Sequence, residues 1–306
     1  MPAPAIRTSR LTKDYGSGRG VFDLELRIGA QEVFGYLGPN GAGKTTTIRL
    51  LMGMIRPTSG SAWIHGLDSV RESVAVKRKV GYLPGDVPQF GSMRGDEVVA
   101  YLAGMRGGVD ARRVRSLAER FDLDLSRRFR EYSSGNKQKL AILLAFMHAP
   151  ELLILDEPTS GLDPLNQQEF YALLGEARDE GATIFLSSHV LSEVQRVSDR
   201  VGIIREGRLV QLAQLDELRR IQVHHVEITF GDSDTVPEAA IRDAEGVEDV
   251  TVEGQRVACT VHGDFDALLH AIRNAHVVEL VSTEPSLEEI FLSHFVKPAP
   301  KALPPP

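Results

Sequence analysis

The chain carries at residues 38–46 the segment Gly38-Pro39-Asn40-Gly41-Ala42-Gly43-Lys44-Thr45-Thr46. This segment fits the pattern G-x-x-x-x-G-K-[ST], which in proteins forms a loop around the phosphates of a nucleotide. The apolar run at residues 32–37 predicts a strand before the loop, and the apolar spacing at 45–54 predicts a helix after it. A strand, a glycine-rich loop and a helix in this order direct backbone N–H groups and the positive end of the helix at an anion.

The residue types in this segment suit the chemistry of a nucleoside triphosphate. Glycine at 38, 41 and 43 lets the backbone approach the phosphates, because there is no Cβ to clash. Lys44 is placed to reach the β- and γ-phosphates, and the hydroxyl of Thr45 is placed to hold Mg²⁺. A glycine-rich turn without a ligand is the alternative, but it leaves the flanking strand and helix unexplained. We therefore predict that residues 38–46 bind a nucleotide and Mg²⁺.

Composition limits the classes of protein to which the chain can belong. Its 306 residues suffice for two domains, and its formal net charge of −7 offers no basic field, so we expect no nucleic-acid partner. The single cysteine, Cys259, cannot form an intrachain disulfide, which suits a reducing cytosol. The most apolar run, residues 140–147, is too short to span a bilayer as a helix. A membrane location would therefore require another protein.

The spacing of apolar residues predicts an α/β domain over residues 1–220. Short apolar runs alternate with helices there, which is typical of a parallel sheet covered on both faces. Residues 22–28 alternate between apolar and polar and predict one half-buried strand. Residues 86–149 show helical spacing without a convincing strand and predict a helical insertion, which Gly107-Gly108 divides.

A second, smaller domain is predicted at residues 221–296. Its apolar runs follow the order βαββαβ of a ferredoxin-like α+β domain, and residues 287–295 predict a final helix. The tail, residues 297–306, is rich in proline and is expected to be disordered.

Two acidic residues follow a strongly apolar run at residues 152–155. The run predicts a buried strand that delivers Asp156 and Glu157 to the edge of the sheet where the phosphate loop lies. Because adjacent residues on a strand point to opposite sides, one acid can face Mg²⁺ and the other a water molecule. We assign Asp156 to the metal, and Glu157 to the water as general base or water-positioning residue.

These segments together resemble the ATP-binding cassette (ABC) family, the ATPase subunits of ABC transporters. Alone, Ser133-Ser134-Gly135-Asn136 would indicate only the N-cap of a helix. Beside the phosphate loop and the two acids it matches the family's signature, and the resemblance covers residues 6–220. The matching motifs are the adenine-stacking Tyr15, the Walker A loop at 38–46, the signature at 133–136, the Walker B strand ending at Asp156 with the catalytic Glu157, the D-loop Ser160-Gly161-Leu162-Asp163, and the switch residue His189.

The resemblance implies a fold and an assembly. The fold is a P-loop NTPase cassette with a mixed sheet core, an antiparallel β subdomain and a helical subdomain. Two cassettes meet head to tail with ATP between them, so that Ser133 and the backbone amides of Gly135 and Asn136 donate to the γ-phosphate bound by the other copy. His189 contacts the γ-phosphate and Glu157, which makes the predicted catalytic set Glu157, His189 and Lys44. Ser134 and Asp163 belong to the predicted nucleotide-binding residues with residues 38–46 and Tyr15.

Two motifs depart from the family pattern, the signature and the loop after residue 84. Ser134 stands where the family has glycine, and Asn136 where it has glutamine. Gly85 stands where the family has a glutamine that touches Mg²⁺ and the attacking water, and Asp86 and Gln89 are the neighbouring side chains that could substitute. We expect this second departure to affect metal affinity or coupling to the membrane subunit more than nucleotide binding.

One cassette followed by a small α/β domain looks like the ATPases of daunorubicin-type drug-resistance exporters. The resemblance implies a homodimer at the cytoplasmic face of the membrane, a separate transmembrane permease that docks around residues 82–106, and a regulatory or dimerising C-terminal domain. Two alternatives stay open: a soluble ABC ATPase of ribosomes or chromosomes, and another P-loop class such as a GTPase. The first is disfavoured by the single cassette and the acidic charge, and the second because Lys139 stands where Asn-Lys-x-Asp needs aspartate.

Overall fold

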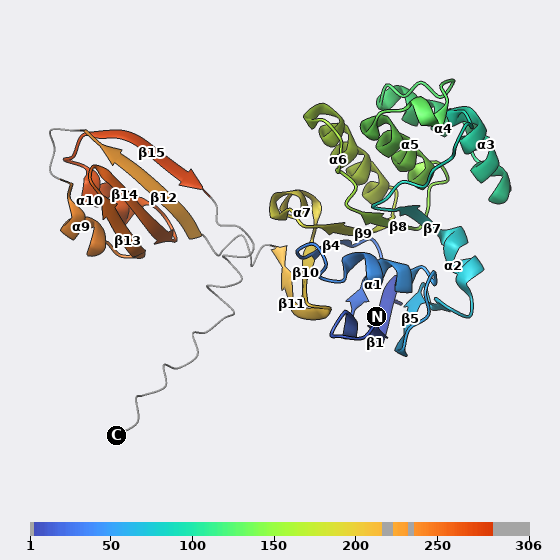
Figure 1. The fold of residues 1–306 in the computed structure, drawn as a ribbon, viewed down its shortest axis with the longest axis horizontal. Helices are drawn as coiled ribbons and strands as arrows, with labels where there is room; N and C mark the ends of the chain where they lie inside the picture. The colour runs from blue at the N-terminus through green and yellow to red at the C-terminus, as the bar shows by residue number, and fades with distance from the viewer. Residues whose placement is uncertain (1–2, 216–222, 232–235, 284–306) are drawn as a thin grey trace. The chain divides into compact units, whose positions relative to one another are not determined.

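The structure is a computed structural model that describes residues 3–215, 223–231 and 236–283. The chain divides into two compact units, Met1–Leu215 and Asp216–Pro306 (Figure 1). The boundary predicted at residue 220, the helix predicted at 287–295 and the tail at 297–306 lie outside the described residues. Within the described residues, no helix combines the length and the apolar character needed to cross a membrane.

A six-stranded central sheet forms the middle of the first unit. Its strands, from one edge to the other, are β11 (Arg208–Gln214), β10 (Arg200–Arg205), β4 (Val33–Leu37), β9 (Thr183–Ser188), β8 (Leu152–Asp156) and β7 (Val80–Leu83). The pairings from β10 to β7 are parallel, and only the hairpin of β10 and β11 is antiparallel. The predicted mixed sheet is therefore confirmed, and the carboxyl ends of its parallel strands meet at one edge.

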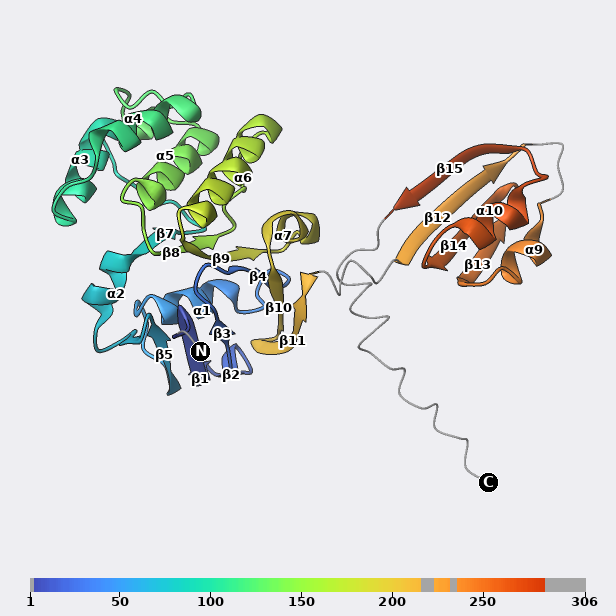
Figure 2. The same cartoon turned by 180° about the vertical axis from the view of Figure 1, so that it is seen from behind.

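Helices cover both faces of this sheet. In the described part of the unit they are α1 (Lys44–Leu51), α2 (Ser73–Lys79), α3 (Gly95–Met105), α4 (Ala111–Arg120), the short 3-10 helix η1 (Phe129–Glu131), α5 (Ser134–Phe146), α6 (Pro164–Asp179) and α7 (Leu191–Val197). Figures 1 and 2 show α1 on one side of the sheet and α5 and α6 on the other. The predicted helical insertion is present as α3, α4 and α5, and Gly107 and Gly108, with φ of 83° and 108°, separate α3 from α4.

The position of strand β8 between two cores explains why its first four residues are all apolar. Leu152 and Ile154 belong to the core on the α1 side of the sheet, whereas Leu153 and Leu155 belong to the core formed with α3 to α6. Alternating side chains of one strand thus enter two different cores. All five residues of β8 are buried.

An antiparallel sheet packs against the other side of α1. It contains β1 (Ile6–Asp14), β2 (Gly20–Leu24), β3 (Arg27–Ile28), β5 (Ser59–Ile64) and β6 (Leu67–Asp68). The prediction of a single strand at residues 22–28 is wrong, because the strand is interrupted between Leu24, where β2 ends, and Arg27, where β3 begins. At this interruption the Thr8 hydroxyl satisfies two backbone groups: it donates to the Leu24 carbonyl and accepts from the Leu26 N–H, each at 2.8 Å.

The second unit has the predicted βαββαβ order. Its elements are β12 (Val223–Phe230), α9 (Glu238–Arg242), β13 (Val247–Glu253), β14 (Arg256–His262), α10 (Asp266–Ile272) and β15 (Val277–Thr283). The strands lie in the order β13-β14-β12-β15 with antiparallel pairing throughout. Two β–α–β segments therefore interlock in one sheet, as the ferredoxin-like prediction requires. Cys259 is buried in the core of this unit.

The aromatic cluster between α1 and the central sheet yields a stability prediction. Phe185 is fully buried, and its ring centroid lies 5.9 Å from that of Phe34 and 5.2 Å from that of Tyr36. Phe185→Ala leaves a cavity and should lower the free energy of unfolding by about 3–5 kcal/mol. Urea unfolding followed by circular dichroism measures this, with the exposed Val74→Ala as control, expected within about 0.5 kcal/mol. Equal losses in both variants would contradict it.

Candidate functional site

The loop between β4 and α1 has the backbone that its glycines predict. Gly41 and Gly43 have φ of 81° and 111°, in the left-handed region that favours glycine. Gly38 is required for a different reason, because a Cβ there would lie 2.3 Å from the carbonyl oxygen of Ile204 on β10. The loop therefore lies against the central sheet, and α1 begins directly after it at Lys44.

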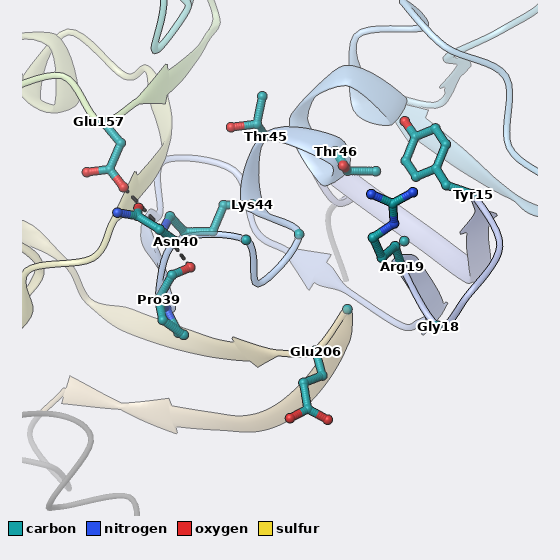
Figure 3. Close-up of a pocket in the computed structure, with 14 residues that line it drawn as sticks. Tyr15, Gly18, Arg19, Pro39, Asn40, Lys44, Thr45, Thr46, Glu157 and Glu206 are labelled. Carbon is teal, nitrogen blue, oxygen red and sulfur yellow. Dashed lines mark hydrogen bonds and ion pairs between the residues drawn. The ribbon is translucent and has the colours of Figure 1, made fainter.

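A cavity of about 550 Å³ opens beside this loop (Figure 3). The predicted site residues that line it are Tyr15, Pro39, Asn40, Gly41, Gly43, Lys44, Thr45, Thr46 and Glu157. Gly38 and Ala42 belong to the same loop without lining the cavity. The remaining walls come from the loop between β1 and β2 and from the β10–β11 turn, which contribute Gly18, Arg19, Gly20, Glu206 and Gly207.

The ammonium group of Lys44 lies beside Glu157 at the cavity wall. The side chain is buried, and Nζ donates to the carbonyl oxygens of Gly38, at 2.6 Å, and Pro39, at 3.3 Å. The same atom forms an ion pair of 3.2 Å with Oε1 of Glu157. The lysine thus joins its own loop to the acid that follows β8 (Figure 3).

The predicted metal ligands Thr45 and Asp156 are in direct contact. The Thr45 hydroxyl donates to Asp156 Oδ2 at 2.8 Å, and the Ser187 hydroxyl donates to Oδ1 at 2.5 Å. The Asp156 side chain is only 1% exposed, so these two hydroxyls satisfy a carboxylate that water hardly reaches. Sequence reasoning missed Ser187, although a serine at the end of a buried strand is a signal that can be recognised.

Glu157 and His189 form the second predicted pair. Glu157 Oε2 lies 2.8 Å from His189 Nδ1, and the Glu157 backbone N–H donates to the carbonyl of Ser187. The expectation that strand alternation separates the two acids needs correction. Asp156 ends β8, and Glu157 has a left-handed backbone with φ of 49°, so a turn of the chain gives its carboxylate a different direction.

The signature segment and Asp163 lie together elsewhere in the unit. Ser133 is the N-cap of α5 and its hydroxyl accepts from the Asn136 N–H at 3.2 Å, whereas Asp163 is the N-cap of α6. A Cβ on Gly135 would lie 3.1 Å from the carbonyl oxygen of Gly161, so the two segments are neighbours. None of the described residues 133–136, nor Asp163, lines the cavity. Hydrogen bonds from the first turn of α6, led by that of Asn166, lower the pKa of Asp163.

Gly85 lies against the Asp156 carboxylate. A Cβ at this position would be 3.3 Å from Oδ2, so a larger residue would crowd the acid. The expected substitutes, Asp86 and Gln89, are exposed and do not line the cavity. Burial, and next the negative charge of Asp156, raise the pKa of the nearby Tyr82 to about 12.

Arg19 is a cavity residue that sequence reasoning missed. It stands between Gly18 and Gly20 in the loop after β1, where its backbone carbonyl accepts a hydrogen bond from the Tyr15 N–H at 2.9 Å, and it lines the cavity with Tyr15 (Figure 3). A lone arginine in a glycine-rich loop carries no periodic signal. Only the folded structure brings it to the same cavity as residues 39–46.

The fold and the cavity define a P-loop nucleoside triphosphatase, and the comparisons with known proteins identify its family. The ABC transporter family description matches residues 21–160. The bacitracin transport ATP-binding protein BcrA of Bacillus licheniformis is 38% identical over 231 residues, which cover 74% of this chain and 75% of BcrA. The daunorubicin resistance ATP-binding protein DrrA3 of Streptomyces coeruleorubidus is 31% identical over 305 residues, covering 95% of this chain and 96% of DrrA3.

A solved structure of an ATP-binding subunit of an ABC transporter is similar over 71% of this chain and 92% of its own. Its TM-score is 0.66 and its sequence identity 31%. The chain belongs to the ABC transporter family, and it is an ATP-binding and ATP-hydrolysing subunit. The comparisons lend no support to the alternative of a ribosome- or chromosome-associated ATPase.

The buried contact between Ser187 and Asp156 predicts an effect on stability. Ser187→Ala leaves Oδ1 of a buried carboxylate without this donor and should lower the free energy of unfolding by about 1–3 kcal/mol. Ser126→Ala is a matched control, because Ser126 donates a similar bond of 2.7 Å to Asp124 at an exposed site. Urea unfolding of both variants measures the difference, and a control loss as large as that of Ser187→Ala would contradict the prediction.

Proposed function

We propose that this subunit drives an exporter: two copies bind ATP head to tail, and hydrolysis powers a separate transmembrane permease. The convergence of Lys44, Glu157 and His189 beside the phosphate loop carries the proposal. Two relatives are named for bacitracin transport and daunorubicin resistance, and these functions favour export. The chain then works at the cytoplasmic face of the membrane, where its permease holds it.

The proposed roles follow from the charges of the side chains. Lys44 is buried, and its ammonium group lies among carbonyl oxygens and Glu157. When a nucleotide binds, contacts with the phosphates can replace its ion pair with Glu157. Glu157 positions the attacking water or accepts its proton, and His189 holds the Glu157 carboxylate in place. Tyr15 and Arg19, at the other end of the cavity, contact the nucleoside (Figure 3).

Mg²⁺ fits the donor set formed by Thr45 and Asp156. A hydroxyl and a carboxylate oxygen lie 2.8 Å apart, and oxygen ligands of these kinds are the ones that Mg²⁺ takes in nucleotide sites. When bound, the ion would neutralise negative charge on the phosphates. Asp156 can serve as its ligand while the Ser187 hydroxyl continues to satisfy the other carboxylate oxygen.

The position of the signature supports a head-to-tail dimer. Residues 133–136 and Asp163 do not line the cavity of their own chain, so they are available to a nucleotide bound by a second copy. In that dimer the backbone amides of Gly135 and Asn136, at the first turn of α5, face the γ-phosphate. The C-terminal unit is proposed to regulate or strengthen the dimer.

The permease is proposed to dock around residues 82–106. Apolar side chains are exposed on α3, among them Tyr101 and Met105. Exposed apolar groups of this kind favour a protein interface. Co-purification of the tagged chain with a polytopic membrane protein tests this part, and co-purification with RNA instead would contradict it.

Glu157→Gln tests the proposed chemistry. The amide keeps the size of the side chain but cannot accept a proton, so kcat for ATP hydrolysis should fall about 10²- to 10⁴-fold while ATP still binds. Phosphate release and binding of a fluorescent ATP analogue measure the two quantities. Glu206→Gln, at an exposed acid lining the same cavity, is the control and should retain native kcat. Unchanged hydrolysis in Glu157→Gln would exclude the proposed role.

Arg19→Gln tests the nucleoside end of the cavity. Loss of an exposed cation next to the bound nucleotide should raise KM for ATP about two- to fivefold, equivalent to about 0.5–1 kcal/mol, without changing kcat. The difference from native protein should shrink at high salt, because salt screens exposed charges. Arg112→Gln, which removes an exposed arginine outside the cavity, is the control. A change in kcat with an unchanged KM would contradict the proposed contact between Arg19 and the bound nucleoside.

A further inference from the structure

Glu193 connects two segments that flank the catalytic pair. It lies in the first turn of α7, four residues after His189. Its Oε1 accepts a hydrogen bond from the Thr159 hydroxyl at 2.5 Å, and its Oε2 accepts one from the Ser188 hydroxyl at 2.6 Å. Hydrogen bonds to an ionised carboxylate at these distances are among the stronger ones in proteins.

The first of these hydroxyls belongs to the turn that follows Glu157. Thr159 is buried, its carbonyl accepts from the Leu162 N–H, and the Glu157 carbonyl accepts from the Ser160 N–H. The turn also contacts α5, because the Gln138 amide donates to the Pro158 carbonyl at 2.7 Å. Fixing Thr159 therefore fixes the backbone two residues after Glu157.

The second hydroxyl belongs to the residue before His189. Ser188 Oγ donates to Glu193 and also accepts from the Val190 N–H at 3.0 Å, so its contacts bracket the histidine on both sides. The His189 side chain is itself 50% exposed, and packing cannot fix its ring. The ring position depends on the backbone of residues 188–190, which Glu193 holds.

We propose that Glu193 is a positioning residue for ATP hydrolysis. Its carboxylate joins the turn after Glu157 to the segment that carries His189, and thereby keeps His189 Nδ1 within hydrogen-bond distance of Glu157 Oε2. This inference rests on the proposed roles of Glu157 and His189. It adds a residue that touches neither nucleotide nor water and acts only through these two.

A purely structural role for Glu193 predicts a different set of measurements. If the residue only stabilises α7, its removal lowers the melting temperature and leaves kcat of the folded fraction unchanged. If it positions His189, removal lowers kcat of fully folded protein and leaves ATP binding intact, because Lys44 and the phosphate loop are not touched. The experiment therefore compares kcat, KM and analogue binding at a temperature where circular dichroism shows every variant folded.

The variants are Glu193→Ala, which removes both acceptors, and Glu193→Gln, which keeps the size but loses the charge. We expect kcat at least tenfold lower in Glu193→Ala and an intermediate value in Glu193→Gln, with KM and binding of a non-hydrolysable ATP analogue within twofold of native. Glu176→Ala is the matched control, because Glu176 is a helical glutamate paired with Arg120 at 2.6 Å away from the cavity. It should keep native kcat. Native kcat in both Glu193 variants would overturn the inference.

A double-mutant cycle adds a second criterion. Thr159→Val removes the donor on one side, so Glu193→Ala should reduce kcat less in the Thr159→Val chain than in the native chain. Fully additive losses would overturn the inference, because the two residues would then act independently. Failure of the proposed function is recognised separately: Glu157→Gln would then hydrolyse ATP at the native rate, whatever the Glu193 variants do.

Discussion

The buried carboxylate of Asp156 is the constraint on which the site depends. Burying an ionised acid is costly unless hydrogen bonds or a cation satisfy it. Here the acid receives Thr45 from the start of α1 and Ser187 from β9, so three elements must meet at the same edge of the sheet. The phosphate loop precedes Thr45 directly, and its position relative to β8 follows from this contact.

Two adjacent acids acquire different environments from a single backbone turn. Asp156 ends a strand whose side chains enter two cores and is closed off from water. Glu157 has a left-handed backbone, and its carboxylate meets Lys44 and His189 beside the cavity. The proposed metal ligand is thus held by two hydroxyls in the interior, whereas the proposed water-positioning group contacts a cation and an imidazole beside the cavity.

The segment between Glu157 and Asp163 forms hydrogen bonds with side chains of two helices. It is held from α5 by Gln138 and from α7 by Glu193, and its Gly161 lies against Gly135 of the signature. Both helices therefore contact the backbone that directly follows the acid beside the cavity. In the proposed dimer the same segment carries Asp163 toward the other nucleotide, which gives the two sites a continuous physical connection.

Local sequence determined the phosphate loop, the strand that ends in two acids, the helical insertion and the βαββαβ order. Each of these depends on residues close together in the chain, where periodicity and glycine conformation act directly. Tertiary structure alone decided the break between β2 and β3, the Ser187 contact, the place of Arg19 and the link through Glu193. These depend on partners distant in sequence, such as Thr8 for Leu24 and Ser187 for Asp156. The sequence around a hydroxyl does not specify its hydrogen-bond partner, because folding brings the two together.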